Sequence, residues 1–137
     1  MKHLLDSGPL IAFLREDDEW HEWAVANLSL LTGEFLTCDA VIAEAAHLLR
    51  TLPGGYDSLL AMVETGRLRV LPVFPAETTA LRALRKKYGP RMDFADACLV
   101  RLAELHLRST VVTLDSDFSF YRRNGHDRIP LLAPFAK

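Results

Sequence analysis

The sequence predicts a single α/β domain built as a three-layer α/β/α sandwich around a central, mainly parallel sheet. Short apolar runs alternate with longer segments of helical periodicity along the chain. Half of the 137 residues are hydrophobic and a quarter are charged, which suffices for one core and predicts one domain over 1–137. No internal repeat or low-complexity linker interrupts the alternation. Parallel strands joined by crossovers need helices on both faces of the sheet.

The N-terminal half contains two expected strands and four expected helices. Pro9 suits the first turn of a helix, because its missing N–H has no partner there. The spacing of Trp20, Trp23 and Leu28 continues a helical pattern, and Gly33 ends it. The expected elements are a strand at 2–5, helices at 9–14 and 18–31, a strand at 34–37, and helices at 39–52 and 56–65.

The C-terminal half continues the same alternation. The run "RLRVLPVF" is rich in strand-forming residues, and a basic amphipathic segment follows it and ends at Gly89-Pro90. The expected elements are a strand at 67–74, helices at 76–88 and 93–107, a strand at 110–114 and an apolar tail at 129–133.

Charge and cysteine content limit the classes of protein that fit. The net charge of -2 and the pI near 6.2 give no general attraction to nucleic acid, so such binding would need a local patch or a metal ion. Cys38 and Cys98 lack CxxC spacing and suit a reducing compartment, as small buried side chains. No apolar stretch approaches the length that spans a bilayer. We therefore expect a cytoplasmic protein with no membrane partner.

Two expected strands are followed by acidic residues. Asp6 comes directly after 2–5, and Asp115 directly after 110–114, with Asp117 two residues later. Ligands of open α/β sheets lie outside the carboxyl ends of the strands, so these carboxylates face the expected ligand site. Helix capping by Asp6 or Ser7 is the alternative. No clear helix follows Asp115 that it could cap.

Three further acids lie on expected helices. Asp93 and Asp96 occupy the first turn of the 93–107 helix, where they resemble a capping box and favour the positive end of the helix dipole. Glu44 lies within an otherwise apolar helix. A solvated face shared with His47 and Thr51 is the alternative to a buried role for Glu44.

If Asp6, Glu44, Asp96 and Asp115 converge, their mutual repulsion requires cations between them. Mg²⁺ or Mn²⁺ suits a site of oxygen ligands, whereas structural zinc would want cysteine and histidine. The histidines form no HxH or HExxH motif. A divalent ion neutralises phosphate charge and lowers the pKa of bound water. Phosphodiester hydrolysis is therefore the reaction that fits this acidic site.

The sequence resembles the PIN-domain ribonuclease family and, within it, VapC toxins of toxin–antitoxin pairs. Four ordered blocks carry the resemblance: "LLDSGPLIAFL" (4–14), "TCDAVIAEAAHLL" (37–49), "MDFADACLVRLAE" (92–104) and "VVTLDSDF" (111–118). The resemblance implies a PIN-like α/β/α fold, one or two divalent metal ions, and endonucleolytic cleavage of single-stranded RNA. It also implies an antitoxin partner and a homodimer.

Matched block to block, the resemblance implies that four acids are the catalytic metal ligands: Asp6, Glu44, Asp96 and Asp115. Asp93 could assist Asp96, and Asp117 could share or replace the role of Asp115. Hydroxyl side chains could orient the carboxylates or remain simple turn or strand hydrogen-bond donors; they are Ser7, Thr37 and Thr113.

Basic and aromatic residues suggest how RNA could be held. Basic side chains flank the later acids, either to guide phosphates or as solvated surface; they are Arg82, Arg85, Lys86, Lys87, Arg91, Arg122, Arg123 and Arg128. Tyr121 could stack on an unpaired base or lie in the core. Trp20 and Trp23 could form a partner surface or be buried within the domain.

Other functions compete with a ribonuclease. A PIN-type module that binds RNA or protein without catalysis would keep the acids only as caps, and an RNA-processing nuclease would act without an antitoxin. A receiver-like signalling domain is disfavoured, because no pair of aspartates follows the first strand and no lysine follows a late strand.

Overall fold

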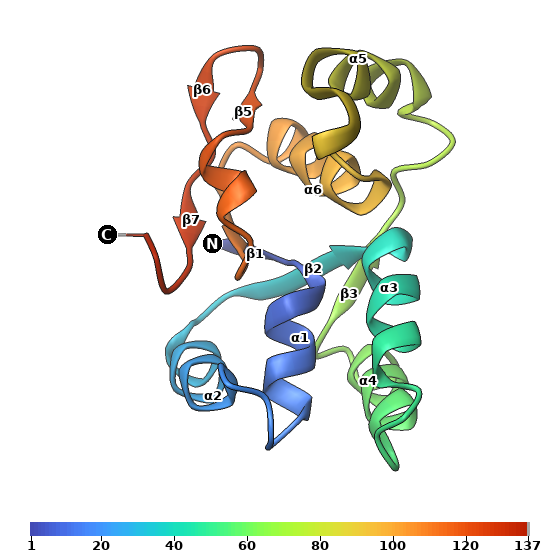
Figure 1. Cartoon of the computed structure of the whole chain (residues 1–137), viewed down its shortest axis with the longest axis vertical. Helices are drawn as coiled ribbons and strands as arrows, with labels where there is room; N and C mark the ends of the chain where they lie inside the picture. Colours follow the sequence, from blue (N-terminus) through green and yellow to red (C-terminus); the bar gives the residue numbers. More distant parts are fainter. Residues whose placement is uncertain (137) are drawn as a thin grey trace.

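The computed structural model describes residues 1–136 and has the predicted three layers (Figure 1). The middle layer is a five-stranded sheet in the order β3-β2-β1-β4-β7, in which every neighbouring pair is parallel. The strands are β1 Lys2–Leu5, β2 Glu34–Cys38, β3 Arg69–Leu71, β4 Ser109–Val112 and β7 Leu131–Leu132. The prediction of a mainly parallel central sheet is confirmed.

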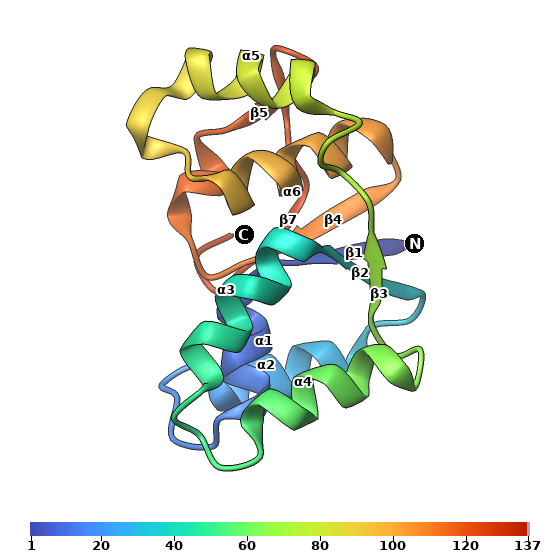
Figure 2. The ribbon, with the colours of Figure 1, turned by 90° about the vertical axis from the view of Figure 1, so that its right-hand side faces the viewer.

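Helices cover both faces of the sheet (Figures 1 and 2). Four lie on one side: α1 Ser7–Leu14, α2 His21–Leu30, α3 Asp39–Leu49 and α4 Gly55–Glu64. Two lie on the other, together with the C-terminal segment: α5 Thr78–Tyr88 and α6 Phe94–Leu105. Each expected helix is present within a few residues of its predicted ends. No helix in residues 1–136 is both long and apolar enough to cross a bilayer.

The strands differ from the sequence-based expectation in two places. The strand expected at 67–74 pairs only over β3, and an antiparallel hairpin of β5 (Arg122–Arg123) and β6 (Asp127–Arg128) was not expected. The hairpin turns at Asn124 and Gly125, both of which have positive φ. An Asn-Gly pair is a strong hairpin signal in sequence, but the flanking residues here are charged and carry no alternating apolar pattern.

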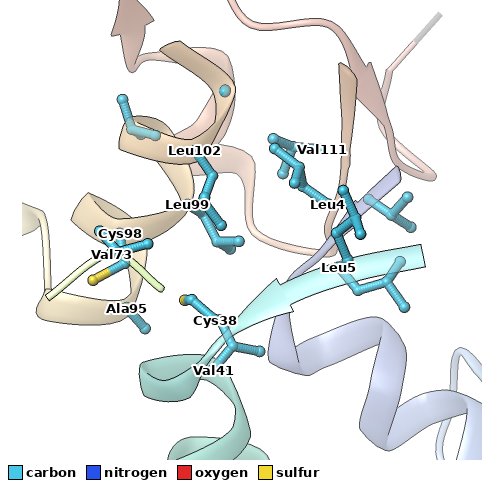
Figure 3. Packing of buried hydrophobic residues seen from close by; sticks show 14 of the residues in the cluster. Leu4, Leu5, Cys38, Val41, Val73, Ala95, Cys98, Leu99, Leu102 and Val111 are labelled. Atoms are coloured by element: carbon cyan, nitrogen blue, oxygen red, sulfur yellow. The ribbon is translucent and has the colours of Figure 1, made fainter. Parts of the chain in front are cut away.

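The apolar core includes the region where the central strands meet α6 (Figure 3). Leu4 and Leu5 on β1 are both buried, as expected for a central parallel strand with helices on both faces. Leu99 and Leu102 of α6 belong to the same apolar cluster. Cys38 also belongs to this cluster as a free thiol, in agreement with its predicted role as a small buried side chain.

The chain reverses its strand order beside β1. From β1 the next two strands are added on one side, and β4 is then added on the opposite side. The backbone N–H of Asp6 donates to the carbonyl of Val112 over 3.0 Å, which ties the end of β1 to the end of β4. The crevice at such a reversal is where open α/β sheets bind ligands, and it lies between these two strand ends.

At the opposite end of β1, Gly33 permits a close backbone approach. Its φ is +108°, and a Cβ there would lie 2.2 Å from the carbonyl oxygen of Met1. We expect Gly33→Ala to lower the free energy of unfolding by about 2 kcal/mol or more, because strain and a backbone clash add. Urea unfolding measures this loss. Gly66→Ala is the matched control, because Gly66 also has positive φ but has open space around it. An equal loss of stability in the two variants would show that the clash with Met1 does not contribute.

Candidate active site

Five carboxylates line one cavity at the carboxyl edge of the sheet. The cavity, here called the acidic cavity, has a volume of about 240 Å³. Its lining residues are Asp6, Ser7, Gly8, Glu44, Asp93, Asp96, Leu114 and Asp115. They come from the ends of β1 and β4 and from the helices α1, α3 and α6. The structure thus brings together all four acids expected to act as ligands.

Asp6 both caps a helix and faces the cavity. Its Oδ1 accepts the backbone N–H of Ser7 over 2.8 Å at the start of α1, and its Oδ2 accepts the Thr113 hydroxyl over 2.7 Å. The two roles are compatible, because each carboxylate oxygen has more than one lone pair. Burial raises the pKa of Asp6 to about 6, against the lowering effect of these two hydrogen bonds, and the nearby Glu44 and Asp115 add to the rise.

Glu44 is directed toward the acidic cavity. The Ser7 hydroxyl donates to Glu44 Oε1 over 2.6 Å, which links α1 to α3 at the cavity wall. Glu44 is partly buried, whereas His47 on the next turn is exposed. The alternative of a solvated face shared with His47 therefore does not describe Glu44.

Asp96 has the most strongly shifted pKa among the acids of the site. Its side chain is buried, and the Tyr121 hydroxyl donates to its Oδ2 over 2.8 Å. Burial raises the pKa of Asp96 to about 8, despite that hydrogen bond, and the charges of Asp93, Asp6 and Asp115 raise it further. Asp93 caps α6 by accepting the Asp96 N–H over 2.8 Å, so the capping interpretation of Asp93 is also correct.

The two acids after β4 have different surroundings. Asp115 lines the acidic cavity, whereas Asp117 forms an ion pair with Arg91 at 3.0 Å and does not line it. Asp115 also accepts the N–H of Asp117 and caps a short 3₁₀ helix, Ser116–Ser119. The expectation that no helix follows Asp115 was wrong, because a single 3₁₀ turn leaves no periodic pattern in the sequence.

The hydroxyl side chains divide into two groups. Ser7 and Thr113 contact acids of the cavity, and Thr113 also accepts the backbone N–H of Asp115 over 2.9 Å. Thr37 instead donates to the carbonyl of Leu5 over 2.8 Å, fully buried between two strands. For Thr37 the strand hydrogen bond is therefore the correct interpretation.

The structure distinguishes between the alternatives for the aromatic candidates. Tyr121 is fully buried and packs edge-to-face against Phe118 at 5.3 Å, so it cannot stack on a base. Its bond to Asp96 is a site contact that sequence reasoning missed, because nothing in the spacing of Tyr121 and Asp96 indicates that they meet. Trp23 packs against the core, while Trp20 remains partly exposed.

Several of the basic side chains are held by backbone carbonyls. Arg85 donates to Met92, Lys87 to Gly125 and Arg122 to Ser119. Arg82 and Lys86 are exposed on α5, as both predicted alternatives require. A role of these side chains in guiding phosphates remains a prediction.

The donor set fits a hard divalent cation. The described residues that line the acidic cavity offer carboxylate and hydroxyl oxygens, and none of them is a lysine, arginine or histidine. Within residues 1–136 the His, Cys, Asp and Glu side chains form no ready-made group of three metal ligands. Mg²⁺ usually binds through one or two carboxylates and retains several waters, so the acids present fit such an ion.

The Tyr121 hydroxyl is expected to tune the metal affinity of Asp96. Tyr121→Phe removes a donor to the carboxylate while it keeps the ring packing, so we expect Mn²⁺ affinity to fall by roughly 10- to 100-fold. Calorimetric titration of the folded variant measures this change. Tyr88→Phe is a suitable control, because the Tyr88 hydroxyl accepts the Arg122 N–H and does not contact these acids. Equal affinity of Tyr121→Phe and wild type would contradict the expectation.

Three solved structures are similar in fold to this chain. VapC20 from Mycobacterium tuberculosis, a sarcin-ricin loop cleaving toxin, matches with a TM-score of 0.76 at 20% identity, over 86% of this chain and 93% of that one. VapBC2 from Rickettsia felis, bound to a DNA fragment from its promoter, matches with a TM-score of 0.70 at 16% identity, over 97% and 98%. FitAcB from Neisseria gonorrhoeae matches with a TM-score of 0.59 at 24% identity, over 83% and 88%.

The TM-scores show that this chain shares its fold with the three structures. A comparison of the sequence with curated proteins gave no match. The family model described as PIN domain matches residues 3–124, which is most of the chain. The cavity of acids at the strand ends is thus carried on a chain that belongs to the PIN domain family.

Proposed function

We propose that this protein is a metal-dependent endoribonuclease of the VapC type that hydrolyses phosphodiester bonds of single-stranded RNA. The observation that carries the proposal is the acidic cavity, where five carboxylates meet and where no basic side chain of residues 1–136 belongs to the lining. Such a concentration of like charge is unfavourable unless a cation neutralises it. Membership of the PIN family supports nuclease chemistry at this site.

Each residue has a defined part in the proposed reaction. Asp6 and Asp96 would hold the main ion, with Glu44 and Asp115 completing the coordination or orienting the attacking water. When bound, a divalent ion would neutralise phosphate charge and lower the pKa of water. Thr113 and Tyr121 donate to Asp6 and Asp96, which fixes the orientation of the two carboxylates. Ser7 does the same for Glu44.

A role as the toxin of a toxin–antitoxin pair is part of the proposal. The similar solved structures include a toxin that cleaves the sarcin-ricin loop and the complexes VapBC2 and FitAcB. By analogy, we propose an antitoxin protein as a partner, a homodimer as the assembly and the cytoplasm as the location. The fold supports this analogy, since the likeness spans most of each chain.

Cleavage of a mixed single-stranded RNA pool by the purified protein tests the function. We expect cleavage with Mg²⁺ or Mn²⁺, no cleavage with EDTA, and recovery when excess metal is restored. Cleavage that persists in EDTA would contradict a metal-dependent site. RNA binding with no cleavage in any metal would favour the non-catalytic module instead.

A further inference from the structure

A second cavity opens beside the acidic cavity and shares two carboxylates with it. Its volume is about 510 Å³, and Glu44 and Asp93 line both cavities. Buried apolar side chains line its interior, and Figure 3 shows them gathered where β2 and α6 approach each other. These side chains are Cys38, Val73, Ala95 and Cys98. The two cavities therefore adjoin each other at Glu44 and Asp93.

Two exposed phenylalanines belong to this second cavity. Phe74 follows β3 and is 60% exposed, and Phe94 begins α6 and is 53% exposed. Their ring centroids are 5.7 Å apart and their planes meet at 79°. Each ring thus packs on its partner, while more than half of the surface of each residue stays open to solvent. Neither belongs to the hydrophobic core, so the folding of the domain does not explain why the pair is there.

We infer that this aromatic pocket, defined by Phe74, Phe94 and the side chains between them, binds one unpaired nucleobase next to the scissile phosphate. The inference rests on the proposed ribonuclease function and adds a subsite to it. Aromatic side chains stack on any base, because every base has a flat π-face. Single-stranded RNA offers such bases, since they are not held in a helix.

The charges around the pocket favour a base over a phosphate. In the part of the chain that the structure describes, the charged side chains that line it are acidic: Asp39, Glu44 and Asp93. They repel a phosphate that is not neutralised by a metal ion, whereas a base is uncharged and its amino groups can donate to carboxylates. The phosphate therefore belongs in the acidic cavity with the ion, and the adjoining base in the aromatic pocket.

The same charges disfavour a second copy of the chain as the occupant. A symmetric interface would bring the three lining carboxylates of each copy toward those of the other, and like charges facing each other oppose association. A stable interface also buries about 800 Å² per partner, whereas the exposed apolar surface of this pocket is centred on two rings.

Abasic substitution in the RNA tests the subsite. The substrate is a short single-stranded oligonucleotide cut at one position, compared with versions that lack one base on either side of the cut. For wild type we expect one abasic version to lower kcat/KM by roughly 5- to 100-fold, the range that stacking of one base supplies. Phe94→Ala and Phe74→Ala should lose a similar factor on intact RNA. On that abasic version these variants should lose little more, because the interaction is already absent.

Matched variants separate stacking from general effects. Phe94→Tyr keeps an aromatic face and should recover most of the activity that Phe94→Ala loses on intact RNA, whereas Phe94→Leu should behave like Phe94→Ala. Phe135→Ala is the control, because Phe135 is exposed in the C-terminal segment and lines neither cavity. Thermal melting and size-exclusion chromatography of each variant verify the fold and the assembly.

Three results would overturn the inference while the ribonuclease function stands. In the first, both alanine variants cut intact RNA at the wild-type rate. In the second, the loss from the variant and the loss from the abasic RNA multiply when the two are combined. In the third, a change of assembly accounts for the lost activity. The last would assign the pocket to a second copy. If wild type cuts no RNA at all, the proposed function fails first, and the subsite fails with it.

Discussion

Asp96→Asn should abolish RNA cleavage and leave the protein folded. The variant keeps the size of the side chain and an oxygen that can accept the Tyr121 hydroxyl, which now contacts Asp96 at 2.8 Å. It removes the negative charge that a metal ion needs. We therefore expect kcat/KM to fall by more than about 100-fold, a larger loss than a supporting residue gives. Rates on one defined RNA at saturating Mn²⁺ measure the effect, and circular dichroism checks the fold.

A matched pair of aspartates gives the control. Asp117→Asn changes the same functional group two residues after Asp115, but Asp117 pairs with Arg91 and does not line the acidic cavity. We expect Asp115→Asn to lose activity strongly and Asp117→Asn to stay within a few-fold of wild type. The reverse order would place the fourth acid at Asp117. An unfolded Asp96→Asn protein would show that the residue is mainly structural.

The metal-free protein should become less stable as the pH rises from 5 to 9. The pKa of Asp6 is raised from 3.8 to about 6 and that of Asp96 from 3.8 to about 8, in both cases mainly by burial. Between pH 4 and 8 the folded state therefore holds protons that the unfolded state has released. Stability then falls with rising pH, because the unfolded state binds fewer protons in this window.

The expected size of this fall is on the order of 3 kcal/mol, since each unit of pKa difference corresponds to about 1.4 kcal/mol and solvent relaxation reduces the sum. Urea unfolding in EDTA at several pH values measures it. The stability of Asp96→Asn should change less between pH 6 and 8, because that carboxyl no longer titrates. Asp117→Asn should keep the wild-type slope. Stability that rises over this range would contradict the assigned pKa directions.

Metal should reverse this loss of stability. A divalent ion binds the charged carboxylates of the folded state, so Mn²⁺ should raise the melting temperature more at pH 8 than at pH 5. Equal increases at both pH values would indicate that the ion binds elsewhere. The same comparison with Asp6→Asn tests whether Asp6 is a ligand, because its loss should reduce the effect of Mn²⁺.

The sequence by itself determined the fold class and identified the acids of the candidate site. Alternation of apolar runs and helical periodicity predicts a mainly parallel central sheet and all six helices, because each element buries a face that its own residues define. Asp6 and Asp115 could be placed at the carboxyl edge from their positions after apolar strands alone. Asp93 could be recognised as a cap, because capping depends on residues only a few positions apart.

Only the tertiary structure decided which residues meet. Tyr121 and Asp96 are 25 residues apart, and Ser7 and Glu44 are 37 apart, yet each pair is hydrogen-bonded. Phe74 and Phe94 likewise come from different elements and form one aromatic pair. No local periodicity encodes such contacts, because they arise when strand order and helix packing bring distant segments to one edge. The same packing excludes water from Asp6 and Asp96 and so sets their pKa values.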